Sequence, residues 1–339
     1  MERTAFSLLK EAVRLPVRTS WMFVLMLSLI HLSCTDRSES AGSPDTIRID
    51  FDKSNERLLL NYYIGPYLPE GHDVIETGYV QKVGGNYYLD PDRIKTVPPL
   101  SRLITDGYLD DRVLNWDEFS AFVLDTYYQS RGLPSDLQSL YTESGFRPGD
   151  SSWFQVDVRG VMTTALRRIY VREQALRAAL SDYLANGRRL LYPPGTFIIG
   201  EHWLDTTLAE TTVMRKRADG FWDFAIYGAA GSLVKETKTA PKTLKAPIQC
   251  IGCHTGTKLF EPEKSFPAHA RRGPHGPREI YVKDEWRDAS VVSFFDEHRK
   301  RSDMVLGIYN TLFVSRLLAQ KRAGTLPEDD VILLTTLGL

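Results

Sequence analysis

The chain has 339 residues, of which 42% are hydrophobic and 25% are charged, and its formal net charge is −1. This composition is typical of a soluble globular protein with a sizeable core, and the length favours two domains or one elaborated domain. A net charge near zero excludes a global field that would attract nucleic acid or an anionic membrane surface, so we expect no nucleic-acid partner.

The N-terminus has the pattern of an export signal. An apolar run from Trp21 to Ser33 follows a basic segment, and its length is that of a signal-peptide core, too short to span a bilayer. Cys34 comes next, as in bacterial lipoprotein signals, although His31 stands where an aliphatic residue is usual. We predict a signal peptide over residues 1–33, a lipid anchor on Cys34 and a periplasmic location. The alternative is an ordinary cleaved signal with an incidental cysteine.

The segment after the signal is predicted to be irregular and then β-rich. Residues 34–46 are polar and small, which indicates a flexible tether. From residue 47 to about 110 the pattern predicts short strands and turns, with a hairpin around Gly84-Gly85.

A helix is predicted to begin after Asn115, because Asn115 and Glu118 have the spacing of a capping box. Four apolar side chains of this helix share one face and are expected in the core: Phe119, Phe122, Val123 and Tyr127. Residues 131–152 are rich in Gly, Pro, Ser and Asp, which predicts a connector. We expect residues 47–150 to form a mixed α/β N-terminal region, whose role the sequence does not indicate.

Residues 151–290 are predicted to form a β-rich domain. The patterns indicate, in order, a strand over 165–171, a helix over 173–187, a strand over 196–204 and a hairpin turning at Ala218-Asp219-Gly220. Residues 291–339 are predicted to be helical, with Pro327 near the start of the last helix. The apolar stripe of these helices consists of Leu306, Tyr309, Leu312, Phe313 and Leu317.

Two of the three cysteines lie in the segment Cys250-Ile251-Gly252-Cys253-His254. This spacing matches the attachment sequence of c-type haem. In such a site the two sulfurs bond to the vinyl groups on one edge of the porphyrin, and the imidazole binds the iron. We therefore expect one haem c, held covalently by Cys250 and Cys253, with His254 as the proximal iron ligand.

Three other interpretations of this cysteine pair remain open. A zinc site would need about four ligands, and the further ligands would come from His269, His275 or His298. A thioredoxin-like redox pair would need a strand–helix–strand context. A structural disulfide is the simplest alternative in an oxidising compartment.

The segment from about Ala165 to Pro267 resembles the cytochrome P-460 family of mono-haem c-type cytochromes. The matching pieces, in order, are RRIYV with a following helix, PPGTFIIGEHW, FWDFAIYGAAG, and QCIGCHTG with LF a few residues later. The resemblance covers about a third of the chain and implies an antiparallel β-sheet around one haem. Residues before and after this segment lie outside the resemblance.

One departure from the family concerns its hydroxylamine-oxidising members, in which a lysine is cross-linked to the haem. Gly200 stands where that lysine is expected, and the nearest downstream lysine is Lys216 on the next strand. This difference argues against hydroxylamine oxidation, so an oxidoreductase activity stays open. Members without the lysine resemble cytochrome c′-beta, whose open iron site, shielded by aromatic side chains, binds nitric oxide or carbon monoxide.

The sixth iron ligand separates the candidate functions, because a methionine or a second histidine would close the iron and favour electron transfer. The candidates are His202, Met214, His269, His275, His298 and Met304, of which Met304 is the one we select. Five of these six have an ordinary alternative: Met304 fills a core, His202 is a satisfied sheet histidine, and the other three histidines are solvated. An open iron would instead be walled by Phe224, Tyr227 or Phe260.

The expected fold class is α+β: an antiparallel β-sheet haem domain with flanking helices, preceded by the mixed α/β region. The first functional hypothesis is an exported mono-haem c-type cytochrome that transfers electrons to or from a periplasmic redox partner. The second is a haem protein with an open iron that binds a gas or reacts with a nitrogen oxide. The third is a non-haem lipoprotein with a structural CxxC.

Overall fold

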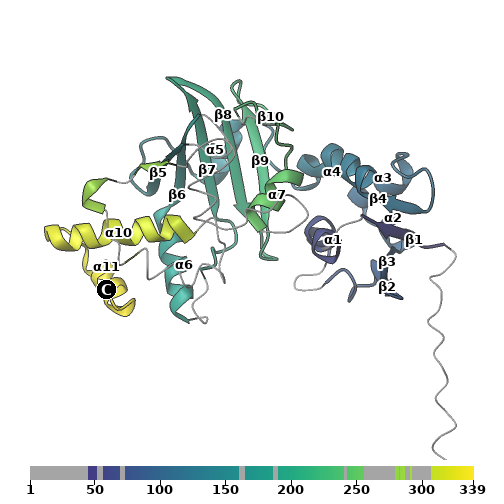
Figure 1. Cartoon of the computed structure of the whole chain (residues 1–339), viewed down its shortest axis with the longest axis horizontal. Coiled ribbons are helices and arrows are strands. Elements are labelled where there is room, and N and C mark those ends of the chain that lie inside the picture. The colour runs from purple at the N-terminus through teal and green to yellow at the C-terminus, as the bar shows by residue number, and fades with distance from the viewer. Residues whose placement is uncertain are drawn as a thin grey trace, which may run out of the picture.

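The computed structural model contains two β-sheets with helices packed around them (Figure 1). The structure describes residues 45–51, 56–68, 73–159, 165–185, 190–239, 243–255, 279–281, 283–286, 291 and 307–339. The predicted signal peptide, the lipidation site Cys34 and most of the tether lie outside the described residues. So do five of the candidate site residues: Phe260, His269, His275, His298 and Met304.

The N-terminal region is built on a four-stranded sheet with the order β2-β3-β1-β4. Its strands are β1 (Ile47–Asp50), β2 (Val80–Val83), β3 (Asn86–Leu89) and β4 (Val113–Asn115). Strand β1 pairs antiparallel with β3 and parallel with β4. The predicted hairpin is confirmed, since Gly84 and Gly85 join β2 to β3 with φ angles of 55° and 87°, which only glycine adopts without strain.

Helices also occur between residues 47 and 110, so the prediction of strands and turns alone is wrong there. They are α1 (Glu56–Ile64), the 3₁₀ turn η1 (Gly65–Tyr67), α2 (Pro91–Lys95) and α3 (Pro98–Thr105). Helix α1 has little local signal and forms because Leu59, Leu60, Tyr62 and Tyr63 are buried in the core. Helices α2 and α3 begin at a proline, the residue that favours the first helical position.

Helix α4 (Trp116–Ser130) begins with the predicted capping box. The Asn115 side-chain oxygen accepts from the backbone N–H groups of Asp117 and Glu118, and the Glu118 carboxylate accepts from the Asn115 N–H, each at 3.0 Å. The four predicted core residues of this helix are buried: Phe119, Phe122, Val123 and Tyr127.

The larger sheet has seven strands in the order β10-β9-β8-β7-β6-β5-β11, and every described pairing in it is antiparallel. Its strands are β5 (Trp153–Arg159), β6 (Leu166–Arg172), β7 (Phe197–Leu204), β8 (Thr207–Lys216), β9 (Trp222–Gly228), β10 (Leu233–Val234) and β11 (Glu279–Tyr281). The strands predicted within 165–171 and 196–204 and the hairpin at Asp219-Gly220 are confirmed.

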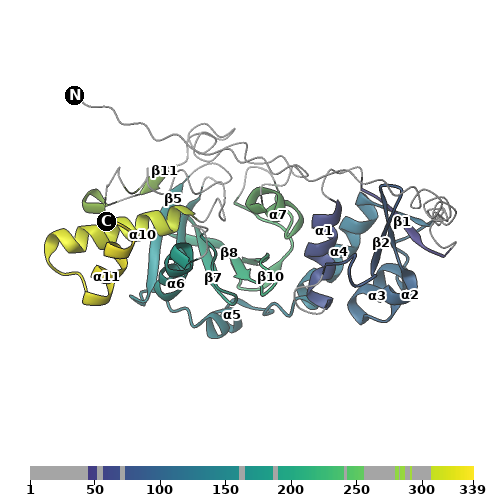
Figure 2. The same cartoon turned by 90° about the horizontal axis from the view of Figure 1, so that it is seen from below.

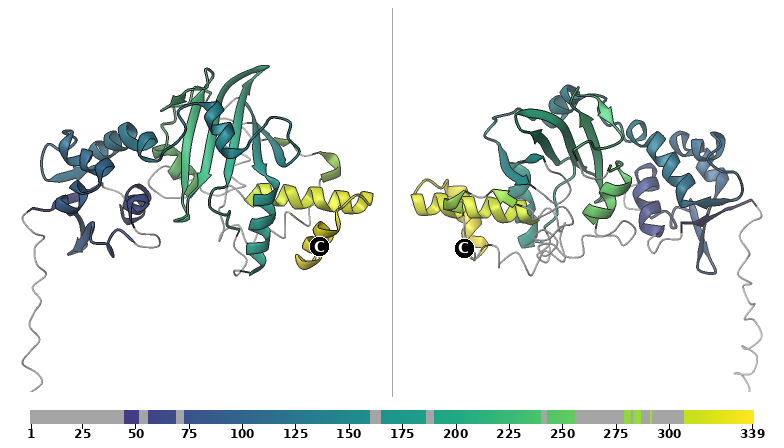
Figure 3. Two further views of the ribbon diagram at one scale, coloured as in Figure 1. Left: turned by 180° about the vertical axis from the view of Figure 1, so that it is seen from behind. Right: turned by 45° about the horizontal axis from the view of Figure 1, so that its top comes forward.

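One face of this sheet is covered by helix α5 (Leu137–Ser144), and we call it the α5 face (Figure 3, left). This helix lies within residues 131–152, where only a connector was predicted. It is short, it begins where Asp136 accepts from the Ser139 N–H at 2.8 Å, and it ends at Gly145 with φ 65°. Phe146 follows and packs against Trp153 and Tyr170 of the sheet, at centroid distances of 5.0 and 4.8 Å.

The opposite face of the sheet, which we call the α10 face, carries the C-terminal helices (Figure 2). Phe313 of α10 (Gly307–Ala323) meets Phe154 of β5 edge-on at 5.6 Å, and Trp286 of η2 (Asp284–Trp286) stacks on the same Phe154 ring. Asn310 of α10 donates to the Leu176 carbonyl of helix α6 (Glu173–Ala185) at 3.1 Å. The last helix, α11 (Glu328–Thr336), begins after Pro327 as predicted.

The architecture confirms the predicted α+β class, with an antiparallel sheet and flanking helices. Among the described residues, no helix is long and apolar enough to cross a membrane.

Candidate functional site

Helix α7 (Ile248–Thr255) contains the whole motif of two cysteines and a histidine. Positions 250, 253 and 254 are separated by three and four residues, so they share one side of a helix with 3.6 residues per turn. Ile248 and Ile251 lie on the other side and are 8% and 1% exposed, whereas Cys250 is half-buried. The motif positions therefore lie on the side of α7 that faces away from its buried isoleucines.

The chain reaches α7 from strand β10 through a segment that is closed by two backbone hydrogen bonds. The Thr237 N–H donates to the Leu244 carbonyl and the Ala246 N–H donates to the Lys235 carbonyl, both at 3.0 Å. The Ala246–Pro247 peptide is cis, and the Ile251 N–H donates to the Pro247 carbonyl at 3.0 Å. The start of α7 is therefore tied directly to the residue that follows β10.

The N-terminal region holds the neighbouring edge of the sheet through three tyrosine hydroxyls. Tyr62 donates to the Trp222 carbonyl at 2.8 Å, Tyr127 accepts from the Phe224 N–H at 2.8 Å, and Tyr128 donates to the Val234 carbonyl at 2.7 Å. Strand β10 pairs with only part of β9, so these hydroxyls satisfy backbone groups that no strand reaches.

Two tyrosines of the N-terminal region, Tyr63 and Tyr128, have pKa values to which Cys250 contributes. Burial and the neighbouring Tyr62 raise the pKa of the Tyr63 hydroxyl well above its ordinary value, and a thiolate at Cys250 raises it further. Burial raises the pKa of Tyr128 too, and Cys250 is the next contributor. A charge on Cys250 therefore acts on one tyrosine of α1 and one of α4.

The Tyr63 hydroxyl is buried and has no hydrogen-bond partner among the described residues. A buried hydroxyl without a partner is unfavourable, because no hydrogen bond compensates for the free energy of its desolvation. The donor set of α7 fits a covalently bound prosthetic group.

His202 of strand β7 lies on the α10 face with both ring nitrogens engaged. Nδ1 is 2.9 Å from the Thr239 hydroxyl and Nε2 is 3.0 Å from the Thr212 hydroxyl. Burial lowers the pKa of His202 to about 3, and the charge of Arg167 acts in the same direction. His202 has the contacts expected of a satisfied sheet histidine rather than those of an iron ligand.

A short polar chain continues from His202 to Glu210. Thr239 donates its hydroxyl proton to Glu210, whose other carboxylate oxygen accepts from the Lys238 N–H at 2.6 Å. Every proton is accommodated when His202 is neutral, with Nδ1–H donating to Thr239 and Nε2 accepting from Thr212. These hydrogen bonds attach the segment between β10 and α7 to strands β7 and β8 in the middle of the sheet.

The other candidates on the sheet divide between its two faces. Met214 and Phe224 are buried on the α10 face, and the register pairs them directly across β8 and β9. Tyr227 points to the α5 face, where its hydroxyl donates to the Pro134 carbonyl at 2.9 Å. Phe224 and Tyr227 therefore cannot wall the same side of a site.

Gly200 lies on the α10 face of β7, next to the His202 chain. A Cβ atom there would lie 2.9 Å from the Thr212 hydroxyl oxygen, which is closer than real side chains allow. Lys216 donates to the Gly220 carbonyl at 2.6 Å, within the hairpin between β8 and β9. The structure thus has no room for a lysine at position 200 unless Thr212 moves.

The structure also bears on two alternatives for the cysteine pair, a zinc site and a thioredoxin-like redox pair. The described part of the chain contains no group of three or more His, Cys, Asp or Glu side chains that could hold a metal ion. The pair lies after antiparallel strands, so the strand–helix–strand context of thioredoxin-like sites is not found around it in the described residues.

Neither Tyr63 nor Tyr128 was predicted from the sequence to be a site residue. Both belong to tyrosine pairs, Tyr62-Tyr63 and Tyr127-Tyr128, and the only signal was this repeated pairing on helical segments. Such pairing does not predict the contacts of the hydroxyl groups, which depend on packing of distant segments.

No family model, curated protein or solved structure matches this chain. The resemblance to the cytochrome P-460 family therefore stays a prediction based on the order of its motifs.

Proposed function

We propose that this protein is an exported mono-haem c-type cytochrome that exchanges electrons with a periplasmic redox partner. The observation that carries the proposal is the position of Cys250, Cys253 and His254 on one side of helix α7. This is the arrangement that two thioether bonds and one axial ligand need.

The chain's own residues would hold and shield the group. Cys250 and Cys253 would form the thioethers, and His254 would bind the iron. Ile248 and Ile251 are buried and fix α7 against the core. Bound haem would supply one-electron chemistry, and burial of its surroundings would tune its potential.

An open iron that binds carbon monoxide, nitric oxide or another nitrogen oxide is the second candidate. It is supported by His202, whose two ring nitrogens are held by hydroxyl groups, so this residue does not compete for the iron. Met214 and Phe224 form a buried apolar pair on the same face of the sheet. A closed, six-coordinate iron would require a ligand such as Met304.

The test is the absorption spectrum of the reduced protein, after export in cells that carry c-type maturation machinery. A covalent haem spectrum that ignores carbon monoxide would support electron transfer, and a Soret band shifted by the gas would support an open iron. Absence of covalent haem would contradict the proposal and favour a non-haem lipoprotein.

Matched cysteine variants make the test specific. The double substitution Cys250→Ala/Cys253→Ala is expected to abolish covalent haem. Cys34→Ala is expected to leave the haem unchanged and to release the protein from membranes. If the double variant still carries covalent haem, the assignment of the motif is wrong.

A further inference from the structure

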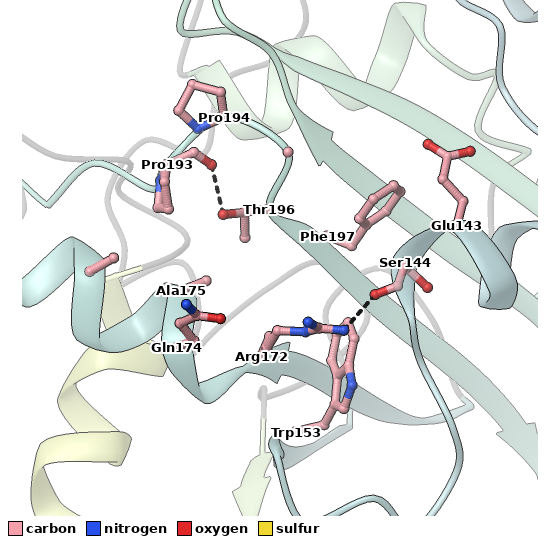
Figure 4. Close-up of a pocket in the computed structure, with 12 residues that line it drawn as sticks. Glu143, Ser144, Trp153, Arg172, Gln174, Ala175, Pro193, Pro194, Thr196 and Phe197 are labelled. Carbon is pink, nitrogen blue, oxygen red and sulfur yellow. Dashed lines mark hydrogen bonds between the residues drawn. The ribbon is translucent and has the colours of Figure 1, made fainter.

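A pocket of about 440 Å³ opens on the α5 face of the seven-stranded sheet (Figure 4). Helix α7 lies on the other side of this sheet (Figure 2). It lies where strands β5 and β7 begin and β6 ends. Its walls come from the end of α5, the first turns of α6 and the turn over 193–196. This volume falls within the range of small-molecule sites.

Arg172 lies across the floor of this pocket in a fixed position (Figure 4). Its Nη2 donates to the Ser144 carbonyl at 2.9 Å, and its guanidinium lies 5.3 Å from the centre of the Trp153 ring. Gly145 leaves the space for it, since a Cβ there would come within 2.5 Å of Nη2. The guanidinium is therefore oriented before any ligand binds.

Most of the donor capacity of Arg172 is unused. A guanidinium has five N–H donors, and the hydrogen bond to Ser144 is the one that the described residues provide. Two carboxylates lie near, but Glu143 is paired with Arg215 at 3.1 Å, and half-buried Asp150 accepts from the Ser152 N–H at 2.9 Å. Neither forms an ion pair with Arg172 in the described part of the chain.

The rest of the pocket combines apolar surfaces with polar groups. Phe197, the rings of Pro193 and Pro194 and the methyl groups of Ala175 and Ala178 supply its apolar part, and Glu143, Ser144, Gln174 and Thr196 add polar groups. Such a lining favours a planar apolar body, with one charged group to fix its orientation.

We propose that this pocket binds a small aromatic carboxylate, with its carboxylate on the unused edge of Arg172 and its ring against Phe197 and the two prolines. Guanidinium and carboxylate groups match in geometry, because two parallel N–H groups can bind the two oxygens. The site lies on the opposite face from α7, so the proposal does not depend on whether haem is attached.

The test is a ligand-observed NMR titration of the full mature protein with benzoate and phenylacetate, using benzamide as the uncharged probe. Both carboxylates are expected to bind at least about tenfold more tightly than benzamide. The substitution Arg172→Gln is expected to weaken benzoate binding by about tenfold or more. Arg168→Gln is the control, since Arg168 lies on the same strand and face but stacks on Trp203 outside the pocket.

A second variant keeps the Arg172 guanidinium and fills the pocket with a larger side chain. Ala178→Leu is expected to abolish binding of both carboxylates, and it decides the question if Arg172→Gln does not fold. The proposal is overturned if neither carboxylate binds the wild-type protein, or if benzoate binds a folded Arg172→Gln variant or Ala178→Leu as tightly as wild type.

Discussion

The Tyr128 hydroxyl on helix α4 donates a 2.7 Å hydrogen bond to the carbonyl oxygen of Val234 on strand β10, 106 residues later in the chain. The same hydroxyl accepts from the Ile226 N–H at 3.4 Å. One side chain thus joins the N-terminal region to the strand that leads into helix α7. Residues 47–150 are therefore part of the structure that positions the motif.

Replacing Tyr128 by phenylalanine should cost about 1 kcal/mol or more of the free energy of unfolding, because two backbone groups lose their side-chain partner. Urea unfolding followed by circular dichroism measures this change. Tyr108→Phe is the matched control, because the Tyr108 hydroxyl bonds Asp125 at an exposed position. Equal costs for the two variants would contradict the role assigned to Tyr128.

Asp223 is a buried carboxylate on β9 that faces three arginines. It lies 3.4 Å from Arg131, 3.3 Å from Arg215 and 3.7 Å from Arg217. The substitution Asp223→Ala should destabilise the fold by about 3–5 kcal/mol, because it leaves the buried guanidinium of Arg131 without its counter-charge. Urea unfolding provides the measurement.

The control for Asp223 is an exposed ion pair across the same junction. Lys235 and Asp125 lie 2.8 Å apart and each side chain is 52% exposed. Lys235→Ala should therefore cost less than about 1 kcal/mol. If Asp223→Ala costs no more than this control, the buried cluster contributes little to holding the two regions together.

The buried His202 predicts a pH dependence of stability. Its folded pKa is lowered to about 3, so between that value and its ordinary pKa of 6.5 the unfolded chain binds a proton that the folded chain does not. Its contribution to the free energy of unfolding is fully present above pH 6.5. It is lost as the pH falls, by up to about 1.4 kcal/mol per pH unit.

Urea unfolding of wild type and His202→Gln across this pH range measures the effect. The stability advantage of the wild type should shrink as the pH falls below 6.5. Glu210 lies 3.4 Å from Nδ1 and acts in the opposite direction, since it would stabilise a protonated ring. An advantage that grows in acid would mean that Glu210 outweighs burial.

Gly200 is expected to be intolerant of larger residues. Gly200→Ala would bring its Cβ to 2.9 Å from the Thr212 hydroxyl oxygen, so we expect a loss of about 1–3 kcal/mol. Gly228→Ala on β9 is the control, because its Cβ would meet the Val234 side chain at the milder distance of 3.3 Å. If Gly200→Ala lowers the free energy of unfolding less in a Thr212→Ala background, the clash with the Thr212 hydroxyl is its cause. If Gly200→Ala does not lower the free energy of unfolding in the wild-type background, there is no such clash.

Much of the local structure could be predicted from the sequence because its causes lie within a few residues. The Asn115 capping box, the Gly84-Gly85 hairpin and the Asp219-Gly220 turn each depend on neighbours three or fewer positions away. The motif in α7 is of the same kind, since its spacing alone defines the expected chemistry.

Only the tertiary structure decided which helices form early in the chain and which groups meet. Helix α1 depends on burial of its tyrosines, and Tyr62 finds its partner, the Trp222 carbonyl, 160 residues away. The sheet register also determines that Phe224 and Tyr227 lie on opposite faces and that Arg172 lines a pocket far from the motif. Such contacts follow from packing of the whole chain, where burial outweighs local preference, and no short segment encodes them.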